Sequence, residues 1–90
     1  MIYLSATYKV DDFKKWYTGF GENEPKRIQA GLRVENIFRD FEDPSQIKVL
    51  MSIESLVAAK EYIETLTAPE YLEKLSIISP VDIKFWDVFY

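Results

Sequence analysis

The chain has 90 residues, of which 48% are apolar and 16% aromatic, so it can form one hydrophobic core and we expect a single domain over residues 1–90. It contains no cysteine and no histidine, which excludes disulfides, thiolate chemistry, zinc-ribbon ligation and the usual general base, so we expect no metal and no cofactor. A net charge of −4 with scattered basic residues argues against nucleic acid as a partner, and the lack of a leader pattern or long apolar run predicts a cytoplasmic protein without membrane contact.

The first third of the chain predicts a strand followed by an interrupted helix. Apolar and polar residues alternate from Ile2 to Val10, the period of a strand. Asp11 is the predicted N-cap of a helix, which Pro25 kinks or restarts and Gly31 ends. Its apolar stripe comprises Phe13, Trp16, Tyr17, Phe20 and, in the same phase, Ile28.

The middle of the chain predicts a hairpin. The segment from Leu32 to Phe41 reads as a strand with mixed faces, one carrying Val34, Asn36, Phe38 and Asp40 and the other Arg33, Glu35, Ile37, Arg39 and Phe41. Residues 42–46 form a predicted turn around Pro44, and Ile47 to Ile53 reads as a central strand.

The last third predicts two helices and a closing strand. Ser55 is the predicted N-cap of a helix that buries Leu56, Ala59, Ile63 and Leu66. A predicted capping box over residues 67–70 opens a shorter helix that buries Tyr71, Leu72 and Leu75. Residues 81–90 form the last predicted strand.

This order predicts a ferredoxin-like α+β fold, βαββαβ, with a four-stranded antiparallel sheet covered by helices on one face. The uncovered face is then too apolar for a monomer, and we expect a homodimer in which two sheets pack face to face. The candidate interface residues are Tyr3, Ile37, Phe41, Leu50, Trp86, Val88 and Tyr90.

The order and spacing of several segments resemble the dimeric α+β barrel superfamily, specifically small proteins related to the antibiotic biosynthesis monooxygenase domain. The segments are residues 9–16, Pro25 and Arg27 before Gly31-Leu32, Ile37-Phe38-Arg39 leading to Glu42-Asp43-Pro44, residues 55–60, Pro69-Glu70-Tyr71-Leu72 and Pro80. The resemblance implies a dimeric barrel with a small cavity between each sheet and its helices, and activities that range from cofactor-independent oxygenases to none. Tyr8 stands where many relatives have histidine, and Val49 and Ile53 stand where the quinone-forming oxygenases have asparagine and tryptophan, so the polar machinery of those enzymes is largely missing.

The candidate ligand-binding residues are Tyr8, Trp16, Asn36, Phe38, Met51 and Phe85, which would line an apolar cavity suited to a small aromatic molecule, bound or oxidised without metal or cofactor. The competing interpretation is ordinary core packing, with Trp16 anchoring its helix to the sheet. On that interpretation the protein is a non-catalytic dimeric module with a structural or regulatory role.

Charged residues offer weaker candidates. Arg39 could bind a substrate carboxylate or form an ion pair with Asp40, Glu42 or a carboxylate of a neighbouring strand. The acidic group Asp40, Glu42 and Asp43 lacks the ligand spacing of a calcium loop and is interpreted as a solvated turn. Asp82 and Lys84 share a strand face and would act as acid and base only if they were buried.

Overall fold

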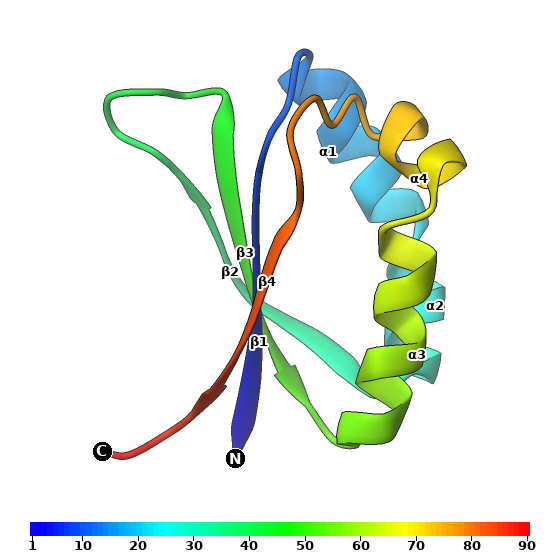
Figure 1. The fold of residues 1–90 in the computed structure, drawn as a ribbon, viewed down its shortest axis with the longest axis vertical. Helices are drawn as coiled ribbons and strands as arrows, with labels where there is room; N and C mark the ends of the chain where they lie inside the picture. Colours follow the sequence, from blue (N-terminus) through cyan, green and yellow to red (C-terminus); the bar gives the residue numbers. More distant parts are fainter.

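A computed structural model describes residues 1–90 and contains one antiparallel sheet with helices on one side (Figure 1). The strands, in the sheet order β2-β3-β1-β4, are β1 (Ile2–Lys9), β2 (Leu32–Arg39), β3 (Gln46–Ile53) and β4 (Asp82–Asp87). The helices are α1 (Phe13–Glu22), α2 (Glu24–Gln29), α3 (Leu56–Leu66) and α4 (Pro69–Lys74). The predicted ferredoxin-like α+β fold is therefore confirmed. None of the four helices has the length and hydropathy needed to cross a membrane.

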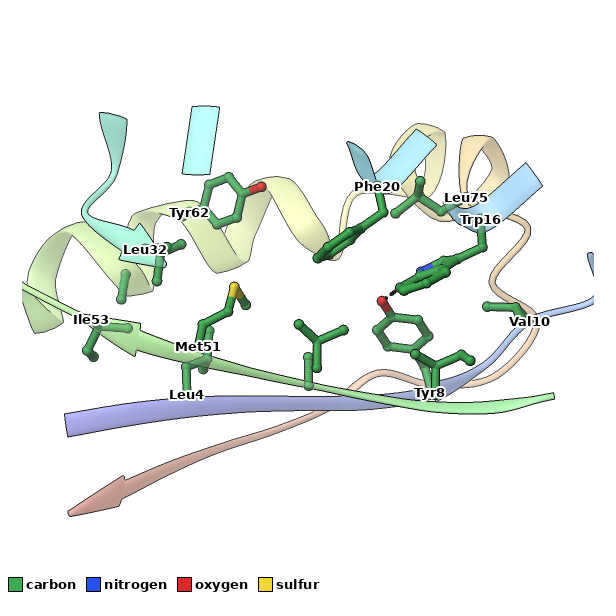
Figure 2. Close-up of a cluster of buried hydrophobic side chains, with 14 residues drawn as sticks. Leu4, Tyr8, Val10, Trp16, Phe20, Leu32, Met51, Ile53, Tyr62 and Leu75 are labelled. Carbon is green, nitrogen blue, oxygen red and sulfur yellow. Dashed lines mark hydrogen bonds between the residues drawn. The ribbon is translucent and has the colours of Figure 1, made fainter. Parts of the chain in front are cut away.

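The core lies between the sheet and the helices (Figure 2). The inward-facing residues of β1 and β3 meet aromatic side chains from α1 and Leu75 from the end of α4. The largest fully buried side chains are Trp16, Leu4, Ile47, Met51, Leu75 and Val49. Each apolar side chain taken out of water in this way contributes roughly 1.5–3 kcal/mol to folding. This core therefore fixes the position of the helices on the sheet.

The helix starts differ in detail from the predicted ones. The N-cap of α1 is Asp12 rather than Asp11, since an Asp12 carboxylate oxygen accepts the backbone N–H of Lys15 at 3.1 Å. Ser55 caps α3 as predicted, accepting the N–H of Ala58. The predicted capping box at residues 67–70 is wrong, because the Thr67 hydroxyl donates back to a carbonyl of α3; α4 nevertheless begins at Pro69.

The core-facing stripe of α1 continues into α2 through polar residues. At about 100° per residue, Trp16, Phe20, Asn23 and Arg27 lie on one side of a continuous helical path, and all four are buried. Ile28 lies about 120° away from Trp16 and is 65% exposed, so its predicted place in the stripe is wrong. Gly31, with φ of 77°, ends the path as predicted.

A bulge in β2 reverses the faces of its second half. Val34 pairs with Met51 but Asn36 pairs with Leu50, so Glu35 is an extra residue in the ladder. After the bulge, Asn36 and Phe38 lie on the uncovered face, while Ile37 and Arg39 lie on the helix side. The predicted faces of this half of the strand are therefore wrong.

The predicted strands are also too long at two ends. β2 ends at Arg39, and Phe41 lies in the following turn with its side chain fully exposed. β4 ends at Asp87, after which Val88 donates its N–H to the carbonyl of Met1 and Tyr90 is fully exposed. Phe41 and Tyr90 therefore lie outside the sheet itself.

Candidate ligand-binding site

A small cavity of about 20 Å³ lies between the sheet and the helices. Its walls come from β1, β3, all the helical segments and the loop before β4, and ten of its eleven lining residues are apolar or aromatic: Ala6, Tyr8, Phe20, Val49, Met51, Leu66, Tyr71, Leu75, Ile77 and Val81. The eleventh is Arg27. This volume holds one or two water molecules, whereas an apolar cavity that admits benzene measures about 150 Å³. The predicted cavity therefore exists, but an aromatic ring does not fit it in this conformation.

Tyr8 reaches from β1 to the first helix. The indole Nε1 of Trp16 donates to the Tyr8 hydroxyl oxygen at 2.8 Å, and the fully buried indole also stacks on Phe20 at 4.9 Å between ring centroids (Figure 2). Burial raises the pKa of Tyr8 far above its ordinary value, and the hydrogen bond from Trp16 only partly opposes this rise. Tyr8 therefore keeps its proton at neutral pH, and Trp16 packs as a helix anchor that does not line the cavity.

Arg27 brings a permanent positive charge to the cavity wall. The residue is 3% exposed, its Nη1 donates to the carbonyl of Phe20 at 2.7 Å, and its Cζ lies 3.8 Å from the centre of the Phe20 ring. Its Nε is buried and has no hydrogen-bond partner. The two ion pairs of the structure, Lys9–Asp43 and Lys74–Glu22, do not involve it. The guanidinium is therefore a buried charge without a carboxylate.

Two further tyrosines surround the same region through Asn23. The Asn23 amide donates to the hydroxyl oxygens of Tyr62 and Tyr71, the latter at 3.1 Å. Burial raises the pKa of both phenols; the neighbouring Tyr62 adds to the rise at Tyr71, and the Arg27 guanidinium opposes the rise at Tyr62. The polar groups near Arg27 are thus neutral hydroxyls and an amide.

Sequence reasoning missed Asn23, Arg27 and Tyr62 as inward-facing residues. The available signal was the helical phase of Trp16 and Phe20, which continues to positions 23 and 27. In α3, Tyr62 is buried while Leu56, predicted to be buried, is 40% exposed. The sequence prediction assigned apolar residues to the buried positions of the helices, so it did not identify the buried polar residues of the site.

The other predicted ligand-binding residues divide between the two faces. Met51 is buried and lines the cavity. Phe85 pairs with Leu4, so its side chain lies on the face of the sheet that the helices cover. It is nevertheless 37% exposed and does not line the cavity. Asn36 and Phe38 lie on the opposite face of the sheet because of the bulge, so their predicted place in the cavity is wrong.

The uncovered face carries most of the predicted interface residues. Tyr3, Leu50, Trp86 and Val88 line a shallow hollow there together with Glu35 and Asn36. The Trp86 indole donates to the Ser5 hydroxyl at 2.8 Å and lies over that buried serine. Ile37 is on the helix side, so its predicted place on the uncovered face is wrong.

The charged candidates have structural roles in the described geometry. The Arg39 guanidinium lies 4.0 Å from the centre of the Phe13 ring and donates to the Pro44 carbonyl, rather than forming an ion pair. Asp40 accepts the backbone N–H groups of Glu42 and Asp43, as expected of a solvated turn. Asp82 and Lys84 are exposed on β4, so burial does not prepare them as an acid and a base.

Solved structures with the same fold include provisionally named antibiotic biosynthesis monooxygenases. One from Nitrosomonas europaea has a TM-score of 0.70 with 14% identity over 100% of both chains, and one from Caulobacter crescentus has 0.70 with 18% identity over 99% of this chain and 90% of the other. An uncharacterised NIPSNAP domain protein from Burkholderia xenovorans has 0.66 with 9% identity over 99% and 95%. No family model and no curated protein matches the chain.

These structures place the chain in a class by its fold. It has the ferredoxin-like α+β fold of the antibiotic biosynthesis monooxygenase-like proteins, which confirms at the level of structure the resemblance found in the sequence. The same fold occurs in a protein named differently, so the fold does not decide the activity.

Proposed function

We propose that the protein binds a small organic molecule between its sheet and its helices, with Tyr8, Tyr71 and Arg27 as the polar contacts. The observation that carries this proposal is the composition of the cavity wall. Tyr8, Tyr71 and Arg27, from three different elements, are among the residues that line the cavity, and the surface they and their neighbours expose to it is almost wholly apolar. A few polar groups in a mainly apolar pocket is the usual composition of a small-molecule site.

Binding of an aromatic ring requires the helix layer to move away from the sheet. That layer is built from short helices: α2 and α4 have six residues each, Asn23 alone separates α1 from α2, and Thr67-Ala68 separate α3 from α4. Such separations allow one helix to shift without unfolding the next. The small cavity is then the closed form of a larger site.

Binding is better supported than oxidation of the bound molecule. A cofactor-independent oxidation begins when a proton leaves the substrate, and this requires a group able to accept it. Tyr8 and Tyr71 stay protonated because burial raises the pKa of both phenols, and arginine does not lose its proton. The residues that line the cavity therefore include no base.

The functional unit of this proposal is a homodimer joined through the uncovered sheet face. That face combines Leu50, Trp86 and Val88 with groups of both charges, Lys48 and Lys84 against Glu35 and Asp82. Because positive and negative groups occur on the same face, it is complementary to a second copy turned by a two-fold rotation. A non-catalytic dimeric module is the second candidate, and it would use this face alone.

A methyl NMR titration with benzyl alcohol and benzoate tests the binding site. We expect the resonances of Val49 and Met51, which line the cavity, to shift, while those of Leu50 and Val88 on the uncovered face do not. Ala6→Val, which adds volume to the cavity wall, should weaken binding, and Val57→Ala on the exposed side of α3 is the matched control. Shifts confined to the uncovered face, or no shifts, would favour the non-catalytic module.

A further inference from the structure

Arg27 is a buried positive charge that forms no ion pair with a carboxylate of the chain. A guanidinium remains charged at all accessible pH values, and a buried charge is costly unless it is paired and fully hydrogen-bonded. Arg27 donates from Nη1 to the Phe20 carbonyl and has the ring of Phe20 against its face, and its guanidinium also interacts with the Tyr62 hydroxyl. Its Nε has no partner. The Phe20 carbonyl and the Phe20 ring compensate the charge of Arg27 only in part, because neither carries a full negative charge.

No carboxylate of the chain supplies the missing charge. Glu22 is exposed and pairs with Lys74 at 3.3 Å, and Glu24 is exposed and forms no ion pair with Arg27. The nearby phenols of Tyr62 and Tyr71 cannot act as anions, because burial raises their pKa. No carboxylate of the chain forms an ion pair with Arg27, so an anion from outside the chain would supply the charge that the described ion pairs do not.

We propose that the ligand of this site is a small organic anion, with a carboxylate or phenolate oxygen held by the Arg27 guanidinium and by the Tyr8 and Tyr71 hydroxyls. This inference rests on the proposed function and specifies its ligand class. Nη1 is occupied by Phe20, which leaves the Nε edge of the guanidinium for a planar oxyanion, the geometry in which arginine binds carboxylates. Tyr8 accepts from Trp16 and Tyr71 accepts from Asn23, so each hydroxyl still has its own proton to donate.

The position of Arg27 also gives the anion a route to the charge. Arg27 lines the small cavity, and it is the one residue that also lines a larger groove between α2, the start of β2 and the end of β3. With Arg27 counted, that groove is lined by two arginines, the other being Arg33, and by two glutamates, Glu24 and Glu54, so its formal side-chain charges balance. The guanidinium is thus the boundary between solvent and the interior.

The competing explanation is that Arg27 only clamps the end of α1 through the Phe20 carbonyl. Thermal unfolding and calorimetric binding at constant ionic strength separate the two, using benzoate and its neutral analogue benzyl alcohol. The variants are Arg27→Met, which keeps a long apolar side chain, and Lys60→Met, the control on the exposed side of α3. We expect benzoate to raise the Tm of the wild type and of Lys60→Met, and its Kd to weaken about tenfold or more in Arg27→Met, as for the loss of one charged hydrogen bond.

The possible results distinguish this inference from the proposed function. If benzyl alcohol binds as tightly as benzoate, and Arg27→Met changes neither, the site exists but its ligand is not an anion. If neither compound binds, both proposals fail. Should Arg27→Met not fold, the Arg27 Nε–H resonance of the wild type decides: a shift on adding benzoate but not benzyl alcohol supports the anion, and an unmoved resonance overturns it.

Discussion

Tyr8 is buried with its oxygen accepting the Trp16 indole N–H, and burial raises the pKa of its phenol above the ordinary value of about 10. A raised pKa means that the folded state keeps a proton that the unfolded chain loses as the pH rises. The contribution of Tyr8 is therefore fully present below about pH 10 and is lost above it.

We expect the free energy of unfolding to fall above about pH 10, by up to about 1.4 kcal/mol per pH unit from Tyr8 alone. Urea unfolding at a series of pH values measures this slope. Tyr8→Phe should reduce the slope, and at neutral pH it should cost about 1–3 kcal/mol because the Trp16 N–H loses its acceptor. Tyr17→Phe, at an exposed position, is the control; an equal effect from both variants would contradict this role of Tyr8.

Gly19 and Gly21 lie in the same helix but in different surroundings. A Cβ at Gly19 would meet the Leu75 side chain at 2.5 Å, and Leu75 is fully buried, whereas a Cβ at Gly21 would meet nothing within 4 Å. We expect Gly19→Ala to destabilise by about 1–3 kcal/mol through overpacking, reduced by the better helix propensity of alanine. Gly21→Ala should be neutral or stabilise by up to about 1 kcal/mol. Denaturant midpoints compare the two, and an equal change would mean that α4 moves freely against α1.

The residues of the site were partly accessible to sequence reasoning. Tyr8 and Met51 follow from strand alternation, because every second residue of β1 and β3 faces the helices. Asn23 and Arg27 were not found, because a polar residue in a buried helical position contradicts the binary pattern on which such predictions depend. That contradiction was itself the signal, since polar residues in an interior are retained for function or for specific contacts.

Among the elements, α1 shows how a helix start is selected from two adjacent aspartates. Asp12 accepts the N–H of Lys15, while the backbone N–H of Asp11 donates to the carbonyl of Ser76. We expect Asp12→Ala to cost about 1 kcal/mol of stability and Asp11→Ala to cost a few tenths at most. Asp12→Asn should retain the cap. The three variants are compared by thermal unfolding, and an equal loss at both alanine variants would show that the cap is shared.

The elements β2 and β3 show the limit of reading faces from a sequence. Alternation gave the correct inward face for β3, but in β2 one extra residue, Glu35, reversed every position after it. The bulge has no glycine to mark it, and its stabilising contact, the Ser52 hydroxyl donating to the Glu35 carboxylate at 2.8 Å, joins two strands. Such a contact becomes visible only when the register between the strands is known.

At the scale of the whole molecule, the order of elements was predictable because each has its own period and a clear boundary. Helix and strand periods differ, and Pro25, Gly31, Pro44 and Pro69 separate the segments. Chain reversal at each turn then leaves few ways to arrange four strands and their helices. The size of the interior cavity was not predictable, since it depends on the fit of side chains from distant elements.

The uncovered sheet face exposes large apolar side chains in the single chain. Trp86 and Val88 are 46% and 48% exposed in the single chain, and Phe38, which the bulge moves to this side, is 47% exposed. A stable dimer buries roughly 800 Å² on each partner, about an eighth of the 6144 Å² that this chain exposes. Burial of these apolar side chains against a second copy would remove them from water.

We expect size-exclusion chromatography with light scattering to give a dimer for the wild type and a folded monomer for Leu50→Lys, which places a charge at the centre of this face. Val57→Lys makes a similar change on the exposed side of α3 and should remain a dimer. Dissociation should shift the emission of Trp86 to longer wavelength and leave that of the fully buried Trp16 unchanged. A monomeric wild type at micromolar concentration, or a Leu50→Lys variant that stays dimeric, would show that this face does not join two copies.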